Sequence, residues 1–331
     1  MMKFKMLING LLILMICSSC SKIKPKEYKL EGNVFGTSFH ITYFSEVNHN
    51  YSTQIDSLFK VVNKSLSTYD ASSDISRINS GEKKVEIDAC FKEVFLKAKR
   101  IYSETNGVFD PTIGVLVNAW GFGPEKTIGN LNDDHIKELL ELVGYDKVTI
   151  TSCCVLKEDQ KIYLDFNAIA KGYGIDVVAR FLEQKEISNY MVEIGGEVRT
   201  RGKNVTGAYW RIGIEKPNFD GTRSLQQIVS LKNESMATSG NYRKFKIDSL
   251  TGEKYVHTID TKTGYTAKRD LLSASVISSL DCADVDGYAT AFMAMGFADT
   301  KEFVAHHSEL KVFLIYVDEN GETQEFSNFP L

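Results

Sequence analysis

Hydrophobic residues recur at helical spacing in four segments of the chain, around residues 55–66, 94–102, 132–144 and 169–185. In each segment an apolar residue returns every third or fourth position, which places these side chains on one face of a helix. The second segment runs into Asn106–Gly107 and the third stops at Gly144, and both are typical helix ends. The pattern therefore predicts four amphipathic helices.

Short β-rich runs dominate the second half of the chain and are separated by turn residues. They cover residues 190–194, 197–202, 209–215, 225–231 and 272–278. A further helix is predicted over 283–295, and a hairpin over 311–326 around the turn "DENG". Helices and strands are segregated along the chain, not strictly alternating. This order favours an α+β fold with mixed or antiparallel sheets over a doubly wound one.

Composition indicates how large a core the chain can bury and which partners its charge excludes. The chain has 331 residues, 43% of them hydrophobic, so it can bury a large core in one domain or two lobes. No glycine-rich or proline-rich linker divides it, so two lobes would share one folding unit. The net charge is −4 and no basic stripe is present. Nucleic acid is therefore not an expected partner.

The first residues form a different kind of segment. Lys3 and Lys5 precede the apolar run 6–17, which is too short for a membrane-spanning helix and is typical of an export signal. Ser18 and Ser19 directly before Cys20 resemble the lipobox of bacterial lipoproteins, although Cys17 stands where leucine is usual. We expect a signal peptide over 1–19, a lipidated Cys20 and a polar tether over 20–31. A plain secretory signal cut nearby is the alternative.

Four further cysteines remain: Cys90, Cys153, Cys154 and Cys282. The neighbouring Cys153 and Cys154 cannot readily bond to each other. No CxxC or Cys/His spacing is present, so no structural zinc is expected. A disulfide between distant cysteines is open in an oxidising compartment.

Common catalytic motifs are absent, but Asp286 and Thr290 stand four residues apart in the predicted late helix. A carboxylate and a hydroxyl would then share one helix face. Oxygen ligands of this kind suit Mg²⁺. The alternative is a solvent-facing or capping aspartate and a threonine bonded back to its own helix.

The segment "HTIDTKTGY", residues 257–265, combines an imidazole and a carboxylate with a tight turn. Thr258 and Ile259 resemble the end of a strand, and Gly264 closes the turn. Taken alone, this segment favours a hydrogen-bonded histidine at a strand end over a functional His257.

Nine segments in order resemble the ApbE family of flavin transferases, which move FMN from FAD to a threonine of another protein. The resemblance runs from about Val34 to Gly296. It rests on "FGTSFHIT", "LSTYDASSDISRIN", "GVFDPTIGVLVNAWGFG", "LDFNAIAKGYGID", "EIGGEVRTRG", "WRIGIEKP", "ATSGNYRKF", "HTIDTKTG" and "DVDGYATAFMAMG". It implies a flavin-transferase domain over 32–331 with the family's T-fold-related architecture. The flavin nucleotide would lie in a cleft between two lobes.

The resemblance also implies roles for individual residues. The Mg²⁺ ligands would be Asp286, Thr290 and the main-chain carbonyl of Ala168. The FAD-binding residues would be Phe35, Tyr69, Val108, Phe109, Asp110, Asp165 and Lys171, together with His257, which also falls at the position implicated in catalysis. Asp260 would fix the turn after His257 or assist nearby.

The chain departs from the family pattern at two positions. Phe35 stands where many relatives carry methionine, which leaves the shape of the pocket open. Thr261 replaces a proline after Asp260 and is expected to loosen that turn. Asp284, two residues before Asp286, is a rival metal ligand, but it lacks the four-residue spacing to Thr290.

Three functions are compatible with these residues. The first is an Mg²⁺-dependent FMN transferase that releases AMP, in which His257 acts as a general base or orients the incoming hydroxyl. Its acceptor would be a redox subunit, of the Na⁺-translocating NADH:quinone reductase or Rnf type. The enzyme would then be lipid-anchored on the periplasmic side of the cell membrane. The second is an FAD pyrophosphatase that uses water, and the third is a flavin-binding lipoprotein without catalysis.

Overall fold

The fold is described from a computed structural model that covers most of the chain. It describes residues 25–125, 131–218, 222, 224–241, 245–247, 254–267 and 269–331. The predicted signal peptide over 1–19 and the predicted lipidation site Cys20 lie outside the described residues. Within the described part, no helix is long and apolar enough to cross a membrane.

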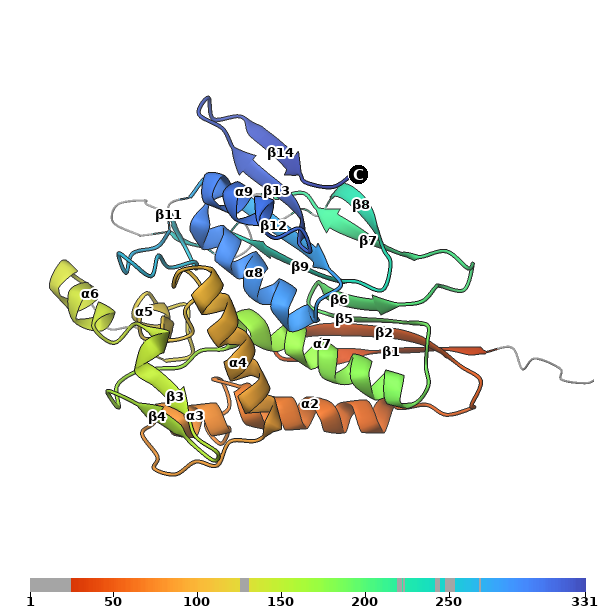
Figure 1. The fold of residues 1–331 in the computed structure, drawn as a ribbon, viewed down its shortest axis with the longest axis horizontal. Coiled ribbons are helices and arrows are strands. Elements are labelled where there is room, and N and C mark those ends of the chain that lie inside the picture. The colour runs from red at the N-terminus through yellow and green to blue at the C-terminus, as the bar shows by residue number, and fades with distance from the viewer. Residues whose placement is uncertain are drawn as a thin grey trace, which may run out of the picture.

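An eight-stranded sheet forms the centre of the molecule, with the strand order β1-β2-β5-β6-β9-β12-β13-β14 (Figure 1). All neighbouring strands in it are antiparallel. The strands are β1 (Lys26–Val34), β2 (Thr37–Ser45), β5 (Tyr190–Ile194), β6 (Glu197–Arg201), β9 (Ser235–Gly240), β12 (Leu271–Ser278), β13 (Lys311–Val317) and β14 (Thr323–Ser327). This confirms the predicted α+β class with antiparallel strands.

Helices cover one face of this sheet. Helices α7 (Asn167–Gln184) and α8 (Cys282–Met295) lie against its central strands, and α2 (Ser52–Leu66) and α4 (Ala89–Glu104) pack against them (Figure 1). Buried apolar side chains from the sheet and these helices form the main core. The opposite face carries a smaller apolar cluster under the hairpin of β7 (Trp210–Glu215) and β8 (Leu225–Leu231).

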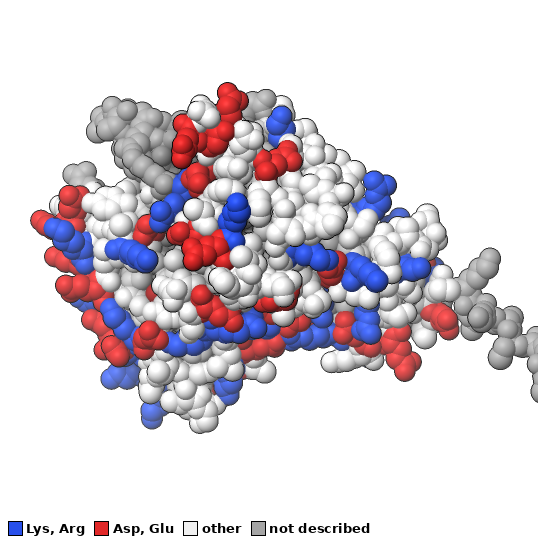
Figure 2. Space-filling view, turned by 45° about the horizontal axis from the view of Figure 1, so that its top comes forward, with Lys and Arg blue, Asp and Glu red and all other residues white. Residues whose placement is uncertain are grey.

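The remaining elements extend the molecule at one side. They are α3 (Asp74–Asn79), α5 (Gly114–Ala119), α6 (Asp133–Leu140), the short helix Tyr145–Lys147 and the hairpin of β3 (Val148–Ile150) and β4 (Val155–Lys157) (Figure 1). The others are α9 (Phe297–Ala305) and the pair β10 (Phe245–Ile247) and β11 (Lys254–Val256). Over the face drawn in Figure 2, Lys and Arg are interspersed with Asp and Glu.

Most elements predicted from the hydrophobic pattern are present. Helix α6 is shorter than predicted, because it ends at Leu140 and the chain turns before Gly144. The tether predicted over 20–31 also differs, since Lys26–Val34 forms the edge strand β1. Tyr28 is buried there and pairs with Tyr43 of β2, so part of the polar-looking segment contributes to the core. The four cysteines after the N-terminal segment are free thiols.

A close helix contact fixes the relative position of α7 and α8. A Cβ atom on Gly172 would stand 2.4 Å from the carbonyl oxygen of Cys282, so only glycine fits there. Asp176 of α7 also accepts hydrogen bonds from the first two amides of α8, those of Cys282 and Ala283, both at 2.8 Å. The start of α8 is therefore fixed on α7, and with it the register of the residues that follow.

Candidate active site

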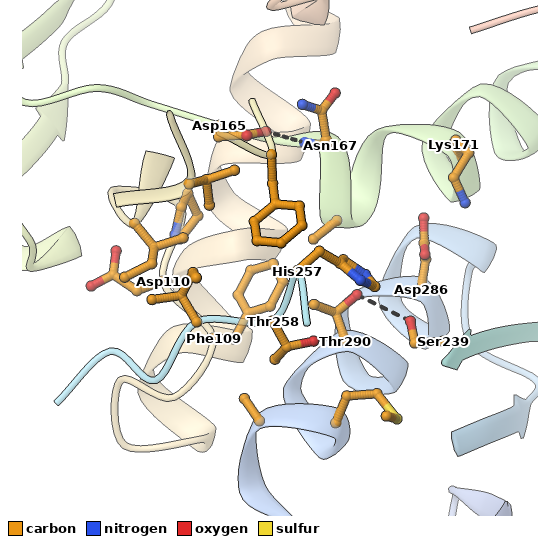
Figure 3. A pocket seen from close by; sticks show the side chains of 18 of the residues that line it. Phe109, Asp110, Asp165, Asn167, Lys171, Ser239, His257, Thr258, Asp286 and Thr290 are labelled. Atoms are coloured by element: carbon orange, nitrogen blue, oxygen red, sulfur yellow. Dashed lines mark hydrogen bonds between the residues drawn. The ribbon is translucent and has the colours of Figure 1, made fainter. Parts of the chain in front are cut away.

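One pocket of about 510 Å³ collects every predicted site residue of the described chain. Its volume is in the range of small-molecule and cofactor sites. The predicted residues that line it are Phe35, Tyr69, Val108, Phe109, Asp110, Asp165, Ala168, Lys171, His257, Asp286 and Thr290. They come from the β1–β2 turn, several loops, the start of α7 and the middle of α8, so the fold alone brings them together (Figure 3).

Asp286 and Thr290 share the face of α8 that borders the pocket. Asp286 Oδ2 accepts a hydrogen bond from the Gly172 amide at 3.1 Å, and Thr290 Oγ1 lies 3.3 Å from Ser239 Oγ of β9. Figure 3 shows the Lys171 side chain facing Asp286. Burial raises the pKa of Asp286 to about 7, with Lys171 opposing the shift and Glu197 adding to it. A carboxylate placed in this way is strongly stabilised by a nearby cation.

Lys171 is held between two carboxylates. It forms an ion pair with Glu197 and interacts electrostatically with Asp286. Burial alone would lower the pKa of Lys171, but these two carboxylates raise it above its usual value. The ammonium group therefore stays charged at the polar end of the pocket.

Asp284, the rival metal ligand, points to different partners. Its carboxylate forms ion pairs with Lys97 at 2.9 Å and with Arg100 at 2.8 Å, and it does not line the pocket. Both cations belong to α4, on the side of α8 that packs against that helix. Of the two aspartates, the geometry therefore favours Asp286 as the metal ligand.

The Phe35 ring forms an apolar part of the pocket wall. Phe35 and Gly36 connect β1 to β2 with φ values of 50° and 75°, which is the conformation of a two-residue hairpin turn. The ring packs against Phe59 at 5.7 Å between centroids and lies over Gly174, where a Cβ would stand 2.5 Å from it. Tyr69 is 68% exposed and stands at the rim. These aromatic surfaces suit a flat ring.

Two of the predicted flavin-binding carboxylates also have structural partners. Both oxygens of Asp110 are engaged: Oδ1 accepts from the amide and hydroxyl of Thr112, and Oδ2 accepts from the Tyr145 amide. Asp165 Oδ1 accepts from the Asn167 amide at 2.7 Å, at the start of α7. Burial raises the pKa of both carboxyls, and these hydrogen bonds oppose the shift. Asp110 therefore borders the pocket, but its hydrogen bonds mainly stabilise its own loop.

His257 directly follows β11 and lines the pocket. The predicted strand end differs, because β11 stops at Val256 and Ile259 forms only an isolated bridge with Thr266. The turn itself is confirmed: the Gly264 amide donates to the Asp260 carbonyl at 2.8 Å, and Gly264 has φ 76°.

Asp260 fixes this turn. Its Oδ1 accepts from the amides of Lys262 and Thr263, and its Oδ2 pairs with Arg269 at 2.8 Å. Thr261 does not loosen the turn as expected, because its hydroxyl donates to the Gly107 carbonyl at 2.9 Å. That bond ties the His257 segment to the loop that carries Val108, Phe109 and Asp110.

Sequence reasoning missed three residues of this site. Gly172 provides the close helix contact and an amide for Asp286. Ser239 and Glu197 lie in segments that resemble the family, but no spacing rule singled them out. A glutamate directly after Gly195–Gly196 was the one signal in the sequence for Glu197.

Comparison with known proteins finds relatives over most of the chain. The sequence model of the ApbE family matches residues 35–314. The chain is 36% identical to the FAD:protein FMN transferase of Haemophilus influenzae over 333 residues, covering 96% of this chain and 95% of that protein. It is 35% identical to the FAD:protein FMN transferase of Vibrio cholerae, covering 93% and 92%.

Solved structures give the same result. The flavin transferase ApbE from Vibrio cholerae superposes with a TM-score of 0.80 at 34% identity, covering 92% of this chain and 97% of that one. The apo form of the Pseudomonas stutzeri flavinyl transferase ApbE gives a TM-score of 0.79 at 25% identity, covering 92% and 96%.

Proposed function

The chain belongs to the ApbE family, and we propose that it transfers FMN from FAD to a threonine hydroxyl of an acceptor protein. The observation that carries this proposal is one pocket that is lined by aromatic rings as well as by charged groups. Phe35 and Tyr69 supply the rings, and Lys171, Asp286 and Thr290 form its charged end. A flavin nucleotide has the same two parts, a flat ring and an anionic pyrophosphate.

The residues at the charged end fit a magnesium ion. Asp286, Thr290 and the carbonyl of Ala168 would hold it, because each offers an oxygen atom as a metal ligand at the pocket wall. No group of three or more His, Cys, Asp and Glu side chains suitable for a metal occurs among the described residues. Mg²⁺ does not need one, because it keeps waters and substrate phosphate oxygens as further ligands. When bound, the ion would neutralise charge on the pyrophosphate.

The side chains of the chain would then organise the transfer. Lys171 and the Gly172 amide hold Asp286 in place. The acceptor hydroxyl attacks the phosphorus of the FMN half, a new P–O bond forms, and the P–O bond to AMP breaks. AMP leaves with the bonding electron pair, and His257 takes the hydroxyl proton. In-line placement and charge neutralisation are the main requirements of such a step.

Two other functions share this pocket. With water in place of threonine the same residues would hydrolyse FAD to FMN and AMP, and without turnover the protein would only bind flavin. The names of the relatives favour the transferase. The test is mass spectrometry of an acceptor domain incubated with the protein, FAD and Mg²⁺. An FMN adduct on the acceptor supports transfer, AMP with free FMN indicates hydrolysis, and bound intact FAD indicates a binding protein.

The metal assignment has a matched control on the same helix. Asp286→Ala should abolish transfer, because the site loses its carboxylate ligand. Asp284→Asn should instead lower the free energy of unfolding, by about 1–3 kcal/mol, since it removes the charge of a buried carboxylate that pairs with Lys97 and Arg100 away from the pocket. It should retain transfer in the folded fraction. The reverse pattern, with activity lost only in Asp284→Asn, would overturn the assignment.

The acceptor and the location follow from the same proposal. A tether lipidated at Cys20 would keep the pocket at the periplasmic side of the cell membrane. Redox subunits of the Na⁺-translocating NADH:quinone reductase or Rnf type are the acceptors that the family resemblance suggests. Incubating each purified subunit with the protein and FAD tests them directly.

A further inference from the structure

Glu197 is a buried carboxylate of the pocket to which none of the steps above gives a contact with substrate. It is the first residue of β6 and follows the turn Gly195–Gly196, whose φ values are 66° and 109°. The residue is only 4% exposed, yet it lines the same pocket as Lys171 and Asp286. A buried glutamate at this place requires partners for both of its oxygens.

The structure supplies a partner for one oxygen only. Oε1 forms the ion pair with Lys171, whereas Oε2 is buried and has no hydrogen-bond partner among the described residues. Three other buried side-chain atoms there share this property, on Asn118, His135 and Ser273, but none of those residues lines the pocket. An unpartnered buried polar group destabilises the fold, and a charged one does so more strongly. A ligand in the pocket that donates a hydrogen bond would remove this cost.

The surroundings of Oε2 restrict which part of a ligand can reach it. A Cβ on Gly195 would lie 3.5 Å from Oε2 and 2.8 Å from Cγ2 of Thr37. Oε2 therefore lies near the β1–β2 hairpin that carries Phe35, while Oε1 faces Lys171 at the charged end. Glu197 thus lies between Lys171 and the hairpin that carries Phe35.

We propose that Oε2 of Glu197 accepts a hydrogen bond from a hydroxyl of the sugar-like chain that joins the flavin ring to its phosphate. This inference rests on the proposed function for the identity of the ligand. A carboxylate only accepts hydrogen bonds and repels phosphate oxygens, so a hydroxyl donor fits it and a phosphate does not. In FMN the ribityl chain lies between ring and phosphate and carries such hydroxyls. The ribose of the AMP half has the same chemistry and is the rival source.

Flavins with and without this chain provide the test. Riboflavin has the ribityl chain and no phosphate, whereas lumiflavin has the ring alone. Glu197→Ala should weaken riboflavin binding about tenfold, the size expected for losing one hydrogen bond to a charged group. Lumiflavin binding should stay unchanged. Loss of the ion pair with Lys171 affects both ligands alike, since neither carries a phosphate, and so it cancels in the comparison.

Each outcome of the binding experiment decides the assignment. Equal changes for riboflavin and lumiflavin would overturn it. A loss of AMP affinity without a loss of riboflavin affinity would move the contact to the ribose and also overturn it. Glu197→Gln, which keeps the side-chain size, is the second variant if Glu197→Ala does not fold, and it should show the same selective loss in smaller degree. Because no transfer is measured, failure of the transferase proposal leaves this readout intact.

Discussion

Replacing Gly172 by alanine tests whether the contact between α7 and α8 positions the metal ligand. The new Cβ would stand 2.4 Å from the Cys282 oxygen, 2.6 Å from its carbonyl carbon and 2.7 Å from the Ala283 nitrogen. All three are backbone atoms of α8, so no side-chain rotation can relieve the overlap. The two helices must move apart, and the amide of residue 172 then moves away from Asp286 Oδ2.

The expected loss of stability follows from two opposing terms. Overpacking of this kind costs about 3 kcal/mol at the upper end of its usual range, because fixed backbone has to shift. Alanine in place of glycine within a helix returns about 1 kcal/mol. The free energy of unfolding should therefore fall by about 2 kcal/mol, which lowers the urea midpoint at constant slope. Transfer activity should fall further than stability alone explains, because the Asp286 carboxylate is displaced.

Gly287→Ala is the matched control. Its Cβ would approach Ile101 Cδ1 at 2.6 Å, which is the far end of a flexible side chain, and the next atoms are 3.7 Å away. Ile101 can turn aside, and the gain in helix propensity then offsets the remaining strain to within about 1 kcal/mol. If Gly172→Ala were as stable and as active as Gly287→Ala, the close contact would not position Asp286, and the argument would be wrong.

Three further predictions concern other parts of the chain. His257→Ala should lower single-turnover AMP release about a hundredfold while FAD affinity changes much less, as for a general base; normal release with a lowered melting temperature would make His257 a structural residue only. Burial alone would raise the pKa of Asp281, but Lys97, Arg180 and Arg199 more than offset this and hold it well below its usual range. The stability from Asp281 is therefore present above about pH 4 and lost as the pH falls further. The free energy of unfolding should then fall less steeply with decreasing pH for Asp281→Asn than for the wild type. Parallel curves would contradict this. Cys20→Ala should release the protein from membranes, and retention without an acyl label would refute the lipid anchor.

The local pattern of the sequence predicted most helices and strands. It did not predict which distant residues they contact. Helical spacing predicted α2, α4, α6 and α7, because their buried faces repeat within each segment. The predicted tether extended too far, to residue 31. Buried and exposed residues hardly alternate in β1, and most of its residues are exposed. Its strand character comes from pairing with β2, which a pattern within 26–34 does not contain.

The same distinction separates Asp286 from Glu197. The spacing of Asp286 and Thr290 is a property of one helix, so it could be read before the fold was known. The role of Glu197 depends on Lys171, 26 residues earlier, and on an oxygen that the fold leaves unpartnered. Asp110 shows the converse, since its place in the family motif suggested a ligand contact while Thr112 and Tyr145 occupy both of its oxygens. Which carboxylate is available to a ligand is therefore decided by hydrogen-bond partners that only the fold assembles, and Glu197 is the carboxylate of this pocket with a buried oxygen left unpaired.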